Sequence, residues 1–131
     1  MRNVDQLVGD VLKQHPHIAL GILFGSQATG QTTPSSDLDL AVASERLLTA
    51  AESRGLIEDI ALRFGGPVDI IDLNAVAGLI LHQALCKGRV LLNRRPDIYA
   101  RLMLKMWYNQ ADFMPSYRMM LRKRVEAFAH G

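Results

Sequence analysis

The chain has 131 residues and a net charge of +2, and its 49% apolar and 21% charged residues are typical of one globular domain. Its apolar runs fall short of the roughly 20 residues needed to cross a bilayer, its start does not resemble a signal peptide, and a single cysteine excludes both an internal disulfide and a cysteine-based zinc cluster. A cytoplasmic protein is therefore expected, with Cys86 buried and unreactive among apolar neighbours.

The first part of the chain predicts a helix, a buried strand and a loop. Apolar residues recur at helical spacing over 3–14, and Pro16 ends this helix because the residue before a proline disfavours the helical conformation. The continuous apolar run over 18–24 predicts a strand that is buried on both faces of a sheet. A polar loop over 30–36 follows.

Strands and helices alternate through the rest of the chain. Residues 37–43 alternate between polar and apolar, which predicts a strand, and 45–64 predict a helix with Leu47 and Ala51 among its inward side chains. A third strand, a helix capped by Asn74, an edge strand and two C-terminal helices separated by Pro115 are expected next. Their ranges are 68–73, 74–86, 89–92, 96–113 and from Pro115 to about 128.

This alternation predicts an α/β (α+β) architecture. We expect a small mixed sheet of three or four strands flanked by helices. Residues 1–95 would form the core, and residues 96–131 would form a helical extension that packs on the core or on a partner, within a single domain overall.

Charge is divided unevenly between the two ends of the chain. Residues 1–72 hold 5 Lys/Arg and 10 Asp/Glu, whereas 73–131 hold 10 Lys/Arg and 3 Asp/Glu. The two regions could pack together and neutralise each other, or they could form an acidic metal site beside a basic strip for phosphates or an acidic partner.

The residues that follow the first strand have the chemistry of a phosphate site. Gly25 has no Cβ, so backbone can approach an anion closely, and the Ser26 hydroxyl can donate a hydrogen bond to a phosphate oxygen. Ten residues later, Asp37 and Asp39 share one face of the next strand because side chains alternate with period two. Two carboxylates on one face repel each other, and they are also suitable ligands for Mg²⁺, so a metal site is favoured over a solvent-facing strand.

A third carboxylate would complete a two-metal site. Asp69, which follows the Gly-Gly-Pro turn at the start of the neighbouring strand, is the best candidate. Asp72 would face the other way on a regular strand, and we interpret it as a loop or capping residue.

Gly25-Ser26, ten residues and then Asp37-Leu38-Asp39 resemble the signature of the nucleotidyltransferase superfamily, in its minimal (MNT) branch. Asp69 lies where that family has its third carboxylate, and Thr29 stands where an arginine is frequent. The resemblance covers residues 18–73. It implies that Asp37, Asp39 and Asp69 are catalytic and bind metal, and that Gly25 and Ser26 bind nucleotide.

The resemblance also implies an activity and a partner. Members of this superfamily transfer a nucleoside monophosphate from a nucleotide to a hydroxyl, and pyrophosphate leaves. Small solitary members are often antitoxins that transfer AMP to a tyrosine of a HEPN-type ribonuclease toxin. A Mg²⁺-dependent protein adenylyltransferase with ATP as substrate and a HEPN toxin as partner is therefore expected, without direct nucleic-acid binding.

Other functions fit parts of the pattern. An antitoxin of the same fold could neutralise its partner by occlusion alone, without chemistry. A small-molecule nucleotidyltransferase generally carries a further acceptor-binding domain, for which this chain leaves little room. A haloacid dehalogenase-like phosphatase is set aside because its aspartate pair follows an apolar strand, and a P-loop is set aside because no Gly-Lys-Ser/Thr follows the glycines.

Overall fold

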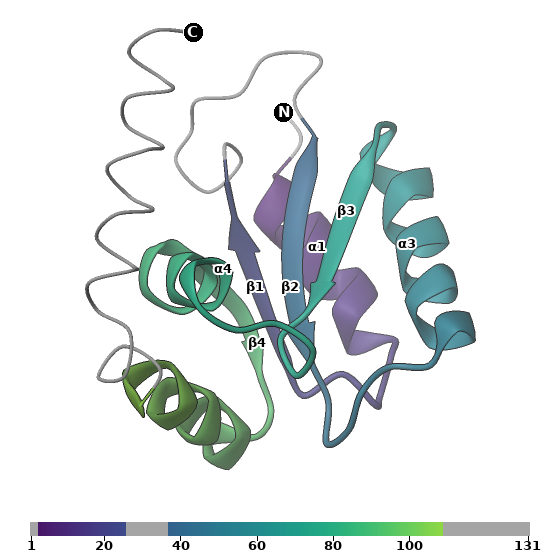
Figure 1. Cartoon of the computed structure of the whole chain (residues 1–131). Coiled ribbons are helices and arrows are strands. Elements are labelled where there is room, and N and C mark those ends of the chain that lie inside the picture. The colour runs from purple at the N-terminus through teal and green to yellow at the C-terminus, as the bar shows by residue number, and fades with distance from the viewer. Residues whose placement is uncertain (1–2, 26–36, 109–131) are drawn as a thin grey trace, which may run out of the picture.

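A four-stranded sheet forms the centre of the molecule, and its strand order is β3-β2-β1-β4. The computed structural model describes residues 3–25 and 37–108 (Figure 1). The strands are β1 Leu20–Phe24, β2 Leu38–Ala43, β3 Val68–Asp72 and β4 Arg89–Asn93. β1 is antiparallel to both β2 and β4, and β2 is parallel to β3, so the expected mixed α/β sheet is confirmed.

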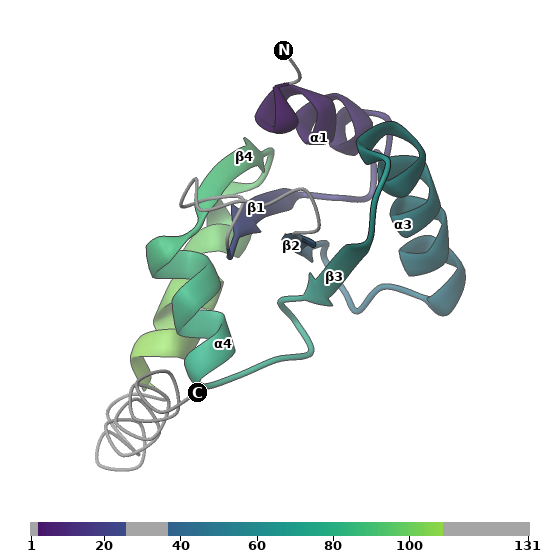
Figure 2. The ribbon, with the colours of Figure 1, turned by 90° about the horizontal axis from the view of Figure 1, so that it is seen from above.

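Helices cover both faces of the sheet (Figure 2). α1 and α3 lie on one face, while α4, the π-helix η1 that continues it, and a helical segment over 96–108 lie on the other. The bounds are α1 Val4–Lys13, α3 Ala50–Phe64, α4 Leu79–His82 and η1 Gln83–Lys87. Within the described ranges, no helix has both the length and the apolar character that a membrane span requires.

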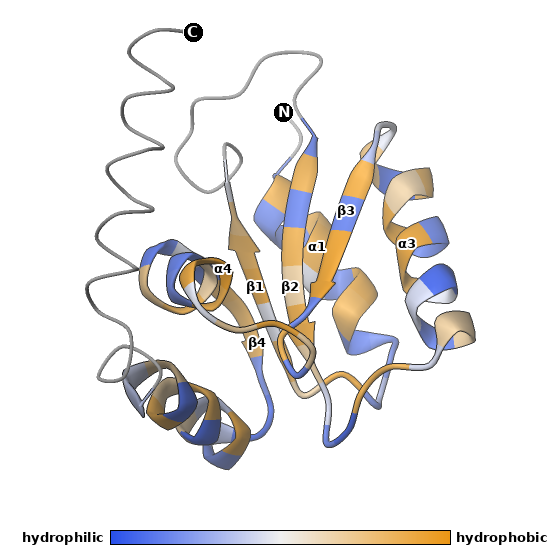
Figure 3. Cartoon of the chain, in the orientation of Figure 1, coloured by the Kyte–Doolittle hydropathy of each residue, from blue (hydrophilic) through white to orange (hydrophobic). Residues whose placement is uncertain are grey.

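Each face of the sheet packs into its own apolar core because strand side chains alternate between the faces. Ile22 and Ala41 point into the core beneath η1 and the 96–108 helix. Leu23 and Leu40, one position away, point into the core beneath α1 and α3. Figure 3 shows the apolar residues concentrated along β1 and β2, so the two central strands supply both cores.

The helix α3 begins later than the sequence pattern indicated. Thr49 is its N-cap: the Thr49 hydroxyl accepts a hydrogen bond from the Glu52 backbone N–H, and the Glu52 carboxylate accepts one from the Thr49 N–H. This capping box starts the helix at Ala50, so the predicted start at residue 45 was wrong. Leu47 is 55% exposed in the preceding loop and Ala51 is exposed on the first turn, so neither faces inward as predicted.

The predicted helix cap at Asn74 was also wrong. The chain turns after β3, and α4 begins only at Leu79, after Gly78 with a backbone φ of 71°. The Asn74 side chain instead donates to the Ser44 carbonyl at 2.9 Å and accepts a hydrogen bond from Arg101 at 3.0 Å. Its amide therefore ties two distant segments together and does not cap a helix.

The prediction that Cys86 is buried was wrong as well, because the helix widens into the π-turn η1 at this point. Ala84 and Leu85 enter the core, whereas Cys86 and Lys87 lie on the surface. The Cys86 sulfur lies 3.6 Å from the sulfur of Met106 in the 96–108 helix.

The helical segment over 96–108 packs on the core formed by β1, β2, α4 and η1. Its side chains Ile98, Leu102 and Met106 are each 4% exposed or less. The expected break at Pro115 and the last basic helix lie outside the described residues, as do Ser26 and Thr29.

Candidate active site

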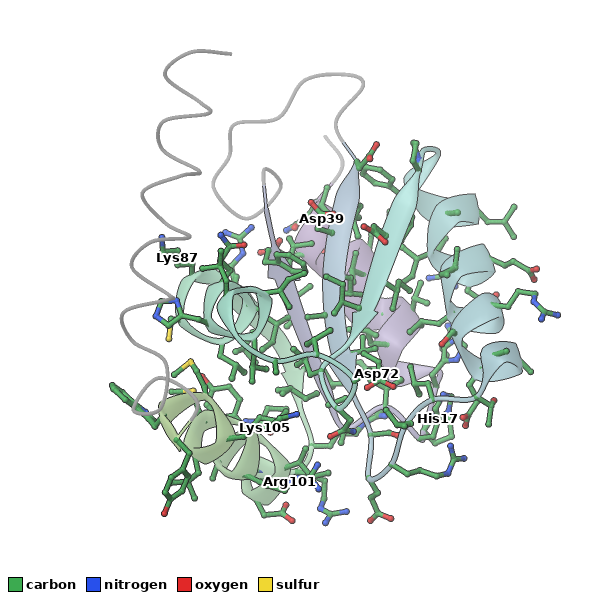
Figure 4. The ribbon with its side chains drawn as sticks, viewed as in Figure 1. His17, Asp39, Asp72, Lys87, Arg101 and Lys105 are labelled. Carbon is green, nitrogen blue, oxygen red and sulfur yellow. The ribbon has the colours of Figure 1, made fainter. Side chains whose placement is uncertain are left out.

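Three strand ends meet at one end of the sheet. β1 ends there and β2 and β3 begin there, because β2 is antiparallel to β1 and parallel to β3. Asp39 occupies the middle of this junction: it pairs with Phe24 of β1 and with Asp69 of β3. Figure 4 shows Asp39 near the start of β2, at this end of the sheet.

The three acidic residues predicted from the sequence lie close enough together for Asp37 and Asp69 to act on Asp39. Asp39 lies on the face of β2 that carries Ala41, Asp69 lies on the face of β3 that carries Ile71, and Asp37 directly precedes β2. Ala41 and Ile71 both pack in the core beneath η1. The carboxylates therefore lie at the rim of the sheet face that α4 and η1 cover.

Burial and the neighbouring carboxylates change the pKa of Asp39, the central residue of the cluster. The pKa of Asp39 is raised from its ordinary value of 3.8, first by burial of the half-buried carboxylate and then by the negative charges of Asp69 and Asp37. Like charges and burial both disfavour the ionised form. A cation placed among these carboxylates would relieve both effects, and perturbed carboxylates of this kind concentrate at functional sites.

Gly25 lies directly against the Asp39 carboxylate. A Cβ added to Gly25 would lie 2.4 Å from Asp39 Oδ2, and the residue has a φ of +76°, in the left-handed region that side chains disfavour. Both observations favour glycine at this position. The space that a side chain would occupy at the end of β1 is taken by the Asp39 carboxylate, so Gly25 brings the backbone into close contact with that carboxylate. The binding of nucleotide by Gly25 stays a prediction, and Ser26 is beyond the described range.

The donor set suits Mg²⁺ that is shared with a phosphate substrate. Among the described residues, no three His, Cys, Asp or Glu side chains are grouped closely enough to hold a metal ion by themselves. Mg²⁺ in nucleotide enzymes is bound by one or two carboxylates together with substrate phosphates and water, so a closed cage of three is not required. The hard oxygen donors of these carboxylates fit that mode of binding.

Asp72 has the structural role that the strand geometry indicated. Its Oδ2 accepts a hydrogen bond from the Leu48 N–H at 2.8 Å, and its Oδ1 accepts one from the Asn74 N–H at 2.9 Å. These bonds hold two loops at the far end of β3, away from Asp39 (Figure 4).

A hollow lies at this far end of the sheet, with a volume of about 720 Å³ and a lining that includes Arg46, Arg94 and Arg95. Each of the three guanidinium groups is already engaged within the chain. Arg46 pairs with Glu52, Arg95 pairs with Glu45 and Asp97, and Arg94 donates to the carbonyls of Lys13, His15 and Ile18. The three guanidinium groups of this hollow are thus held by internal ion pairs and hydrogen bonds.

Lys87 also lies toward the carboxylate end of the sheet. Lys87, the last residue of η1, lies toward the same end as Asp39 in Figure 4. No local sequence motif marks this lysine, because its position depends on the π-helix η1 and on the pairing of β4 with β1.

Two curated relatives are 28–30% identical to this chain over part of its length. "Protein adenylyltransferase MntA" of Aphanizomenon flos-aquae is 30% identical over 97 residues, which cover 66% of this chain and 65% of that protein. "Protein adenylyltransferase MntA" of Shewanella oneidensis is 28% identical over 82 residues, which cover 63% of this chain and 59% of that protein. The chain thus matches less than two thirds of the length of these relatives.

Solved structures share the fold over most of the chain. A chain from a toxin–antitoxin crystal structure with AMP-PNP superposes with a TM-score of 0.72 at 21% identity, over 89% of this chain and 98% of that chain. A chain from a complex of a tri-AMPylated Shewanella oneidensis HEPN toxin with an MNT antitoxin superposes with a TM-score of 0.64 at 22% identity, over 89% of this chain and 98% of that chain.

The family model for "Polymerase beta, Nucleotidyltransferase" matches residues 6–97, a range that contains all four strands, Gly25 and the three carboxylates. Asp39 and Asp69 pair across adjoining strands, and Asp39 lies against Gly25 at the end of β1. The chain belongs to the polymerase beta nucleotidyltransferase family.

Proposed function

We propose that this protein is a Mg²⁺-dependent protein adenylyltransferase that transfers AMP from ATP to a hydroxyl of a partner protein. The observation that carries the proposal is the grouping of Asp39 with Asp37 and Asp69 directly beside Gly25 at the end of β1. This arrangement gives a cation and a phosphate chain adjacent binding positions. Membership of the nucleotidyltransferase family supports the reaction class.

The proposed acceptor is a tyrosine hydroxyl of a cognate HEPN-type toxin, and the proposed role of the chain is that of an antitoxin. Two relatives bear the name protein adenylyltransferase MntA, and one structural neighbour comes from a complex with a tri-AMPylated HEPN toxin. The neighbour crystallised with AMP-PNP supports ATP as the nucleotide. We also propose that the protein is cytoplasmic.

The residues divide the chemistry as follows in this proposal. Asp37 and Asp39 would hold Mg²⁺, which neutralises phosphate charge when bound. Gly25 and Ser26 hold the phosphates through backbone N–H groups and a hydroxyl. Asp69 accepts the proton of the acceptor hydroxyl. The hydroxyl oxygen then bonds to the α-phosphorus as the bond from that phosphorus to pyrophosphate breaks.

The domain arrangement is part of the proposal. Residues 1–95 would carry the nucleotide chemistry, and 96–131 would form an extension that belongs to the same folding unit. Burial of Ile98, Leu102 and Met106 against the sheet supports this division of roles within one domain.

Intact-mass measurement tests the activity directly. The chain and the product of its neighbouring gene are incubated with ATP and Mg²⁺, and both masses are recorded. Mass gains in whole AMP units on the partner are expected with the unmodified chain and with Asp10→Asn, an exposed acidic control on α1. Asp39→Asn should abolish them. Equal gains with Asp39→Asn would show that another site performs the transfer.

A second candidate function is neutralisation by occlusion. The outer side of the 96–108 helix exposes Leu104, Trp107 and Tyr108 to 58%, 58% and 72%, and a surface of this kind favours stable complex formation. Replacing Asp37 and Asp39 together by Asn separates the two functions. Loss of toxin neutralisation in that variant, with the complex still formed, supports catalysis; full neutralisation supports occlusion.

A further inference from the structure

The end of η1 lies beside the end of β1, on the side opposite the carboxylates. β4 pairs with β1 so that Arg89 lies beside Leu23, and Lys87 stands two residues before this pair, at the end of η1. On the other side of β1, Phe24 pairs with Asp39. Figure 4 shows Lys87 and Asp39 toward the same end of the molecule, with Asp72 and Lys105 toward the other.

Gly88 allows the end of η1 to pack closely on β1. A Cβ added to Gly88 would lie 2.3 Å from Ile22 Cγ2 and 2.4 Å from the Ala84 carbonyl oxygen, so the contact between η1 and β1 closes only without a side chain. The residues that precede Gly88 form the π-helix η1, and π-helices are rare and are frequent at functional sites. The position of Lys87 is thus set by close packing on β1.

Lys87 carries a positive charge that the described part of the chain does not neutralise. Its side chain is exposed, and no carboxylate among residues 3–25 and 37–108 forms an ion pair with it. Its charge acts instead on His82, one turn earlier, whose pKa is lowered first by burial and then by Lys87.

Charge therefore reverses across the end of β1. Asp37, Asp39 and Asp69 lie on the side of β2 and β3, Gly25 lies at the strand end, and Lys87 lies on the side of β4. The lysine and the carboxylates belong to the same face of the sheet, because η1 packs on the face whose rim carries the carboxylates. A polyanion at Gly25 is repelled on one side and attracted on the other.

We propose that Lys87 binds the distal phosphates of ATP and orients the triphosphate with its α-phosphate toward the carboxylates. This inference rests on the proposed function and adds a positioning residue to it. A lysine ammonium is a compact point charge that suits phosphate oxygens. The β- and γ-phosphates carry most of the charge of ATP, so the basic side of Gly25 receives that end of the nucleotide.

Titration calorimetry of the full chain with Mg²⁺ tests this assignment, with ATP and AMP as the two probes. Lys87→Met should weaken ATP binding by about tenfold to 100-fold, since a hydrogen bond to a charged group is lost. The affinity for AMP should stay unchanged because AMP lacks the distal phosphates. Lys87→Arg should retain most of the ATP affinity, and Lys13→Met, an exposed lysine on α1, should retain all of it.

Each other outcome has a distinct meaning. If the unmodified chain bound no ATP, the proposed function and this inference would both be overturned. If the unmodified chain bound ATP and Lys87→Met bound it equally well, the inference alone would be overturned. Equal losses of ATP and AMP affinity in Lys87→Met would also overturn it, because the lysine would then act on the fold or on the nucleoside.

Discussion

The Asp39 carboxylate occupies the space that a side chain at Gly25 would need: the position that a Cβ of residue 25 would take lies 2.4 Å from Asp39 Oδ2. The two residues stand on neighbouring strands, since Asp39 pairs with Phe24, the residue before Gly25. Glycine at position 25 is therefore favoured by the carboxylate beside it as well as by the left-handed backbone. Gly25 and Asp39 are fourteen residues apart in the sequence, but they are in contact because β1 and β2 are neighbours in the sheet.

Gly25→Ala should destabilise the fold and abolish ATP binding. The left-handed φ of +76° and the contact with Asp39 both penalise a methyl group, at a cost of at least about 1–3 kcal/mol in the free energy of unfolding. Gly55→Ala is the matched control: a Cβ there meets nothing within 4 Å, and it should stabilise α3 by about 0.5–1 kcal/mol. Urea denaturation measures both, and equal effects of the two changes would contradict the steric argument.

Asp39→Asn should make the fold more stable and the enzyme much less active. Because burial and its neighbours raise the Asp39 pKa in the folded chain, folding favours the protonated form. The carboxylate therefore costs stability once pH rises above its ordinary pKa of 3.8, and the advantage of Asn should grow from acid to neutral pH. Thermal unfolding across this range measures it, while AMP transfer should fall by at least about 100-fold. A stability difference that shrank toward neutral pH would reverse the sign and refute the explanation.

Glu52 should stabilise the fold at neutral pH and lose that effect in acid. Hydrogen bonds from Arg46 and then from the Thr49 N–H lower the Glu52 pKa to about 2 from an ordinary value of 4.5. Its contribution is complete above pH 4.5 and disappears as pH falls through about 2. Glu52→Gln should thus lower the melting temperature at pH 6 and leave it unchanged near pH 2. Glu58→Gln, an exposed change in the same helix, should have little effect at either pH.

The 96–108 helix should contribute to the stability of the core. Leu102 is 2% exposed, and Leu102→Ala should cost about 2–5 kcal/mol in the free energy of unfolding. Leu104, two residues along the same helix, is 58% exposed, and Leu104→Ala should change stability by less than about 0.5 kcal/mol. Chemical denaturation of the two variants compares them directly. Similar small effects would mean that residues 96–108 are dispensable for the fold.

Much of the fold and the grouping of the site could be predicted from the sequence because both depend on short-range periodicity. Alternation over 37–43 places Asp37 and Asp39 on one face, and the continuous apolar run before Gly25 indicates a strand buried on both sides. The parallel register that sets Asp39 beside Asp69 follows once the two strands pair from their first residues. The sites themselves stay predictions until they are tested chemically.

The errors arose where contacts between distant segments override local preference. Asn74 is a good helix cap by type, yet its amide is used by Ser44 and Arg101, which lie far away in the sequence. Cys86 follows an apolar pattern, but a π-turn rotates it outward. The start of α3 could have been found, because Thr49-x-x-Glu52 is a capping box that is visible in the sequence itself.

The pairing of β1 has a consequence for how the protein is made. One neighbour of β1 comes from Leu38–Ala43, but the other comes from Arg89–Asn93, almost seventy residues downstream of β1. During synthesis on the ribosome, one edge of this wholly apolar strand stays open until the last strand emerges. An open apolar edge is a template for pairing with other chains. Expression of any shorter fragment that ends before Arg89 should therefore yield aggregates. β4 thus protects the open edge of β1 only after most of the core has been synthesised.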